Sequence, residues 1–112
     1  ILLTLLAVLA FTGCKEDPQR HLQLAQWYSQ KGLIDEAILE YREVTRLLPA
    51  DIKSLSRADY ELLADAHYRL ALMYTKKDWW GYALQEAETC FELLPTREHY
   101  DMVTLLRKRI DL

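Results

Sequence analysis

The sequence has few of the residues that interrupt helices, with only three glycines and three prolines among 112 residues. Leu, Ala, Glu, Gln, Arg and Lys, which favour helix, are abundant. The composition therefore predicts an all-α fold, and the length predicts a single domain.

The sequence also lacks an excess of charge of one sign: 14 basic and 17 acidic residues give a net charge of −3. A dedicated nucleic-acid-binding domain is strongly basic, so no nucleic-acid partner is expected. There is no His-Glu-x-x-His motif, no glycine-rich phosphate loop, and no Ser or Cys nucleophile with a recognisable base nearby. We therefore expect no enzyme, no metal, no cofactor and no small-molecule substrate.

The first 13 residues carry no charge at all. This apolar stretch is about as long as a signal-peptide core and shorter than the ~20 residues of a spanning helix. It ends in Phe11-Thr12-Gly13-Cys14, which resembles the lipobox of bacterial lipoproteins, where a peptidase cuts before a lipidated cysteine. Thr12 and Gly13 fit that pattern, whereas Leu is more usual at the position of Phe11.

The lipobox resemblance implies export across the inner membrane and a lipid anchor on Cys14. Each buried acyl methylene contributes about 0.8 kcal/mol, so two or more chains would hold the protein at the membrane. Lys15 stands where Asp is associated with inner-membrane retention, which favours the outer membrane, facing the periplasm. We expect residues 1–13 to be a partial signal peptide, 14–17 a short linker and 18–112 a helical domain. The alternative, an N-terminal membrane helix, requires apolar residues upstream of Ile1.

Local signals predict where the helices begin and end. Asp17 is a suitable N-cap for a first helix. Gly32 suits the left-handed backbone conformation in which such a helix often ends. Ser56 predicts the start of a long third helix that runs to about Lys76. Thr96 predicts the cap of a last helix. That helix is expected to run to about Ile110, with an apolar face of Tyr100, Val103, Leu106 and Ile110.

Two helix pairs are duplicated in the sequence with their internal spacing kept. Leu24-Ala25-x-x-Tyr28 recurs as Leu70-Ala71-x-x-Tyr74, a separation of 46 residues (71 − 25 = 46). The same separation relates Ala37 to Ala83, Ile38 to Leu84, and Pro49 to Pro95. Internal repetition of this kind predicts stacked copies of one structural unit.

The duplicated pattern resembles the tetratricopeptide repeat (TPR). The first copy carries Leu24, Ala25, Tyr28, Gly32, Ala37, Tyr41 and Pro49; the second carries Leu70, Ala71, Tyr74, Trp80, Ala83 and Pro95. The pattern departs at His21 and His67, where the family often has Trp, and at Ala87, which replaces an aromatic residue. The resemblance implies an α-solenoid of about five antiparallel helices, two pairs plus a C-terminal capping helix.

The resemblance also implies a concave face lined by the first helix of each pair, where such domains hold a protein or peptide partner. The implied residues are Gln19, Leu22, Gln23, Gln26, Ser29 and Gln30 in the first copy and Asp65, Tyr68, Arg69, Leu72, Thr75 and Lys76 in the second. Arg69 and Lys76 share a helix face, and with Tyr68 they would hold an acidic or C-terminal peptide segment. The alternative is an ordinary solvated face.

Three further side chains are singled out in the fourth helix. We expect Trp80 in the core and Trp79 partly exposed, either as an aromatic anchor for a partner or packed on a neighbouring loop. Cys90 falls on the apolar face and is expected to be a small buried thiol.

Together these features favour a non-catalytic interaction module, lipid-anchored through Cys14 at the bacterial envelope. It would act as a scaffold or assembly factor for a membrane-associated complex. The alternative is a structural subunit that packs permanently into a larger envelope complex and has no peptide groove.

Overall fold

The computed structural model describes residues 16–48 and 51–112, and within them the chain is all-helical, without a strand. The predicted all-α class is confirmed. The elements are α2 (Pro18–Gln30), α3 (Ile34–Leu47), the 3-10 helix η1 (Ile52–Ser54), α4 (Arg57–Lys76), α5 (Trp80–Leu93) and α6 (Arg97–Asp111). Cys14 and Pro49, to which the sequence assigns roles, lie outside the described residues.

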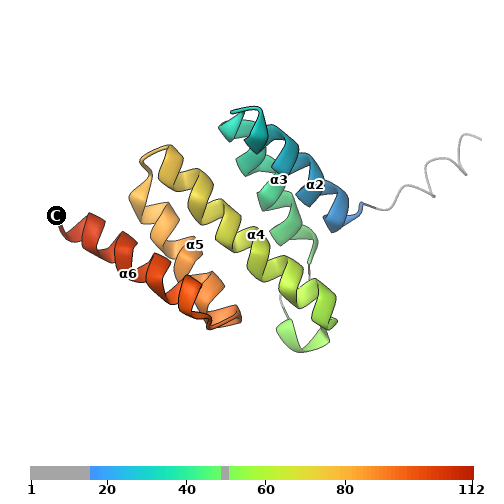
Figure 1. The fold of residues 1–112 in the computed structure, drawn as a ribbon. Helices are drawn as coiled ribbons and strands as arrows, with labels where there is room; N and C mark the ends of the chain where they lie inside the picture. The colour runs from blue at the N-terminus through green and yellow to red at the C-terminus, as the bar shows by residue number, and fades with distance from the viewer. Residues whose placement is uncertain (1–15, 49–50) are drawn as a thin grey trace, which may run out of the picture.

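The helices pack in chain order, each against the next (Figure 1). The long helix α4 lies between α3 and α5, and α6 covers the other side of α5. α2 and α4, the first helices of the two duplicated pairs, also touch. One apolar core runs through the helices from α2 to α6.

The predicted helix starts are confirmed by hydrogen bonds at three N-caps. A side-chain oxygen of each capping residue accepts from a backbone N–H in the first turn, which satisfies a donor that the helix leaves free. The pairs are Asp17 with Gln19 at 3.0 Å, Ser56 with Asp59 at 3.1 Å, and Thr96 with His99 at 3.2 Å.

Each hairpin has a fully buried alanine at the corresponding position of each of its two helices. Ala25 and Ala37 in the first hairpin, and Ala71 and Ala83 in the second, are fully buried. Because a methyl group takes little room, the helix axes can approach closely at these positions. The larger side chain of Tyr41, which is also buried, contributes to the same core.

The duplication extends into the backbone of the turns. Gly32 ends α2 at φ 78°, and Asp78, 46 residues later, ends α4 at φ 59°. In each turn the backbone N–H of the next residue donates to the backbone carbonyl oxygen of the last tyrosine in the preceding helix. Leu33 donates to Tyr28 at 2.9 Å, and Trp79 donates to Tyr74 at 3.0 Å. The glycine was predicted, whereas the left-handed aspartate was not.

The predicted apolar face of the last helix is wrong in part. Val103 and Leu106 are buried as expected, but Tyr100 and Ile110 are about half-exposed. His99 takes the inward position instead, and its Nδ1 lies 2.7 Å from the Leu94 carbonyl oxygen. The helix is rotated so that the stripe at positions 99, 103 and 106 meets α5.

Trp80 is only partly buried, so the expectation of a core residue is met in part. Its ring packs against the edge of the core. The Arg109 guanidinium of α6 lies 4.9 Å from the ring centroid. This cation–π contact joins the end of α6 to the beginning of α5.

Substitution of Gly32 tests the left-handed turn. A methyl group at Gly32 would meet no atom within 4 Å, so the cost of Gly32→Ala comes from the positive φ alone. We expect the free energy of unfolding to fall by about 1–2 kcal/mol in urea titrations. Gly81→Ala, equally open and inside α5, is the matched control and should leave stability unchanged or raise it. Equal effects of the two substitutions would contradict this account.

Candidate functional site

Eight of the twelve side chains predicted to line the concave face occupy one register of α2 and α4. We call them the α2–α4 face, made of Gln19, Gln23, Gln26 and Gln30 with Asp65, Arg69, Leu72 and Lys76. Each residue of the first set precedes its counterpart by 46 positions. All eight are exposed or only partly buried, and the two helices touch. These eight side chains are therefore accessible to solvent, and their binding role stays a prediction.

Arg69 on this face is already paired within the protein. Its Nε donates to Asp65 Oδ2 at 2.9 Å, one turn away on the same helix. The guanidinium also lies beside the buried Tyr41 hydroxyl. Burial raises the pKa of Tyr41, and the nearby Arg69 charge acts in the opposite direction. The cationic character of the face therefore comes mainly from Lys76, which is exposed.

Tyr68 does not belong to the same row. Its counterpart in α2 is Leu22, which was also expected on the concave face but is buried in the core, whereas Tyr68 is partly buried. The Tyr68 hydroxyl donates to Glu98 Oε1 at 2.8 Å, and its ring lies 5.3 Å from that of His99. Tyr68 therefore connects α4 to α6, and its hydroxyl proton is already donated to Glu98.

Trp79 belongs to an aromatic cluster at the α4–α5 turn. It is about half-exposed and stacks on Tyr74 with ring centroids 6.0 Å apart, while Tyr82 meets it edge-on at 6.2 Å. The Lys77 ammonium lies 5.3 Å from the Trp79 ring centroid. These rings line an open hollow of about 930 Å³ that Arg42 of α3 also borders. Trp79 thus packs on its neighbours and remains about half-exposed.

Two histidine–glutamate pairs repeat with the hairpins. His21 Nδ1 lies 2.5 Å from Glu40 Oε2, and His67 Nδ1 lies 2.5 Å from Glu86 Oε2. Each pair joins the first helix of a hairpin to the second and is mostly shielded from solvent. Sequence reasoning noticed the histidines only as departures from the repeat. The 46-residue separation of Glu40 and Glu86 was the signal that would have predicted the pairing.

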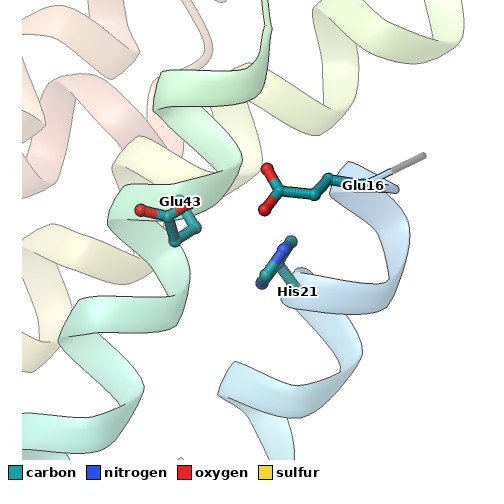
Figure 2. A group of neighbouring side chains, drawn as sticks. All are labelled: Glu16, His21 and Glu43. Carbon is teal, nitrogen blue, oxygen red and sulfur yellow. The ribbon is translucent and has the colours of Figure 1, made fainter. Parts of the chain in front are cut away.

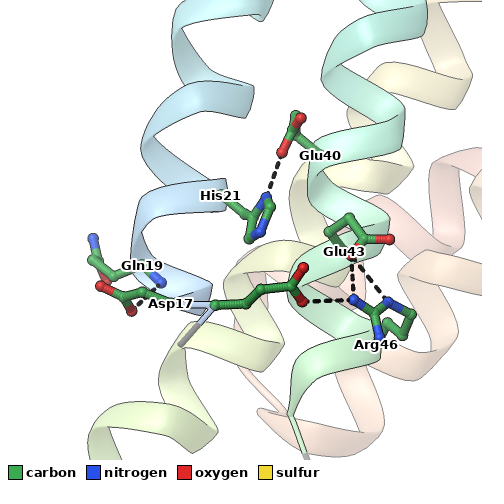
Figure 3. A network of polar contacts seen from close by, with 7 residues as sticks. Asp17, Gln19, His21, Glu40, Glu43 and Arg46 are labelled. Carbon is green, nitrogen blue, oxygen red and sulfur yellow. Dashed lines mark hydrogen bonds and ion pairs between the residues drawn. The ribbon is translucent and has the colours of Figure 1, made fainter. Parts of the chain in front are cut away.

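Glu16, His21 and Glu43 approach one another where α2 begins (Figure 2). One potential ligand atom from each lies within 4.8 Å of the others, a spacing that a metal ion could use. However, Arg46 Nη2 already donates to Glu16 at 2.8 Å and to Glu43 at 2.6 Å, while His21 is held by Glu40 (Figure 3). The hydrogen bond from Arg46 lowers the pKa of the Glu43 carboxyl. The guanidinium therefore supplies the cation that these carboxylates face.

Cys90 is fully buried on α5, as predicted. Burial raises the pKa of its thiol to about 12. The thiolate is the nucleophile in cysteine chemistry, so Cys90 is unreactive at neutral pH. Its role is in packing.

No protein-family model and no curated protein matches the chain. Among residues 16–48 and 51–112, no helix is long and apolar enough to cross a membrane. Any functional assignment therefore rests on the sequence pattern and on the geometry described above.

Removal of either histidine tests the paired contacts. His21→Ala and His67→Ala should each lower the free energy of unfolding by about 1–3 kcal/mol, because a hydrogen bond to a charged group is lost and a partly buried carboxylate is left behind. Arg57→Ala removes the exposed pair with Glu61 and is the control, expected to leave stability unchanged. Histidine variants as stable as the control in urea titrations would show that the pairs contribute nothing.

Alkylation tests the burial of Cys90. In the folded chain we expect iodoacetamide to modify Cys90 at least about 100-fold more slowly than in denaturant, since the thiol is inaccessible and stays protonated. Mass spectrometry of the peptide that contains Cys90 measures the rate independently of Cys14. Rapid modification of the native chain would contradict the assignment.

Proposed function

We propose that this chain is a non-catalytic protein–protein interaction module built as a TPR-like helical stack. The observation that carries the proposal is the residue-by-residue equivalence of the two hairpins, in their alanines, left-handed turns and histidine–glutamate pairs. Packing in chain order covers both flanks of α4 and leaves the α2–α4 face accessible. Such a face is suited to hold another protein.

The α2–α4 face supplies the chemistry of peptide binding. Glutamine amides offer both donors and acceptors, and four of them follow one side of α2 at alternating spacings of four and three residues. Lys76 adds an exposed positive charge, and Arg69 is held in place by Asp65. We propose that the partner is an extended segment with acidic side chains or a terminal carboxylate.

We further propose that a lipid on Cys14 anchors the module at the bacterial envelope, with the outer membrane facing the periplasm as its location. The support is the Phe11-Thr12-Gly13-Cys14 pattern followed by Lys15. In this position the module would serve as a scaffold or assembly factor for a membrane-associated complex.

Charge reversal on the α2–α4 face tests the proposal. The double variant Arg69→Glu with Lys76→Glu should reduce crosslinking to envelope proteins by about tenfold or more, because it would repel an acidic segment. Lys53→Glu with Arg57→Glu makes the same charge change at exposed residues of η1 and the start of α4, and it should leave crosslinking intact. Quantitative mass spectrometry of crosslinked partners gives the readout, with circular dichroism to verify folding.

Undiminished crosslinking in the Arg69 and Lys76 variant would remove this face as the binding site. Size-exclusion chromatography separates the two classes of function. A monomer that binds peptides supports the module, whereas an obligate oligomer would support a structural subunit without a groove.

A further inference from the structure

The two copies differ in which helices pack against their first helix, and this difference leaves one side of α2 exposed. In α4, Leu70 and Met73 are 1% and 4% exposed. Their counterparts in α2, Leu24 and Trp27, are 37% and 50% exposed. α4 has a helix on each flank, because α3 and α5 both pack on it, whereas α2 packs chiefly on α3. The uncovered flank of α2 therefore corresponds to the flank of α4 that packs against α3.

This flank is a single stripe along α2. We call it the α2 end face: Arg20, Leu24, Trp27 and Lys31. Spacings of four, three and four residues place these side chains one above another on a helix. The apolar pair lies in the middle with a cation at each end, and the Lys31 ammonium lies 5.8 Å from the Trp27 ring centroid. An amphipathic helix with acidic ends would complement such a stripe.

The contact between α3 and α4 shows which chemistry fits. Lys77, the counterpart of Lys31, pairs through Nζ with Asp35 Oδ1 at 2.9 Å. Asp35 lies in the first turn of α3. A helix that crossed α2 as α3 crosses α4 would bring its own first turn beside Lys31. An acidic residue there would be paired as Asp35 is.

The other end of the stripe also favours negative charge. Arg20 stands where α4 has the buried Ala66. If a helix lay antiparallel to α2, its C-terminal end would face Arg20. The free carbonyl groups there carry the negative end of the helix dipole and would attract the guanidinium. Because Arg20 is larger than Ala66, the incoming helix also needs a small residue where it crosses Arg20.

We infer that the α2 end face docks one amphipathic helix of a partner protein, antiparallel to α2, with an acidic residue in its first turn. A second copy of this chain is a poor source. Its α3 and α5 are already covered by α4 and α6. Its α6 has Glu98 in the first turn but Lys108 and Arg109 in the last, and an antiparallel arrangement would bring those cations beside Arg20. Residues 1–13 carry no acidic side chain. This surface is separate from the α2–α4 face, so either can fail without the other.

A synthetic helix tests the inference on the full chain. The probe is a capped peptide with the sequence of residues 33–48, which carries the required acid at the position of Asp35. Isothermal titration calorimetry should detect binding, weakened about fivefold by Lys31→Glu and about tenfold by Trp27→Ala. A peptide with Asp35→Lys should bind the wild-type chain weakly and recover affinity toward the Lys31→Glu chain.

Lys77→Glu is the matched control, because Lys77 holds the same register in the second copy. It should leave peptide binding unchanged, as should the Arg69→Glu and Lys76→Glu pair. Three results would overturn the inference: no binding at millimolar peptide, loss of binding through Lys77→Glu but not Lys31→Glu, or a dimer in sedimentation that Trp27→Ala dissociates. The second would mean that the peptide exchanges with α3, and the third would assign the face to self-association.

Discussion

Close contact between the helices at four alanines is the constraint on which the rest of the structure depends. Ala25 and Ala37 in the first hairpin, and Ala71 and Ala83 in the second, are completely buried, and the two helices of each hairpin pack against each other. A larger side chain at any of them would separate the axes and open the core on both sides. The distance between the helices also determines whether side chains farther along can reach one another. The polar contacts of each hairpin therefore presuppose the alanines.

Each hairpin is fastened at two places on either side of its alanines. At the turn, a residue with positive φ reverses the chain, Gly32 in one copy and Asp78 in the other. Away from the turn, His21 or His67 reaches the glutamate of the facing helix. Apolar side chains tolerate small axial shifts of a helix, whereas a directional bond between partly buried groups is satisfied in one register. The pairs therefore define alignment where alanines alone would permit sliding.

Features determined within a few residues could be predicted from the sequence, and features that depend on facing helices could not. The caps at Asp17, Ser56 and Thr96 act within one turn, so their residue types were enough. The constant repeat separation predicted which helices correspond. By contrast, the face of α6 was misjudged at Tyr100, because helical periodicity allows neighbouring stripes and only α5 selects between them. The histidine–glutamate pairs likewise appear only when two helices are placed together.

In the candidate site, too, locally determined features could be predicted from the sequence, and features that depend on neighbouring helices could not. Its register on α2 and α4 followed from the repeat, and the pairing of Arg69 with Asp65 follows the four-residue spacing of a helix. The exposure of Trp27 did not follow from any local pattern, because its counterpart Met73 is buried in an equivalent helix. A repeat defines which side of a helix is apolar. The number of neighbouring helices decides whether that side is covered or exposed to solvent. The surface that folds the second copy onto the first is thus, on α2, available for recognition.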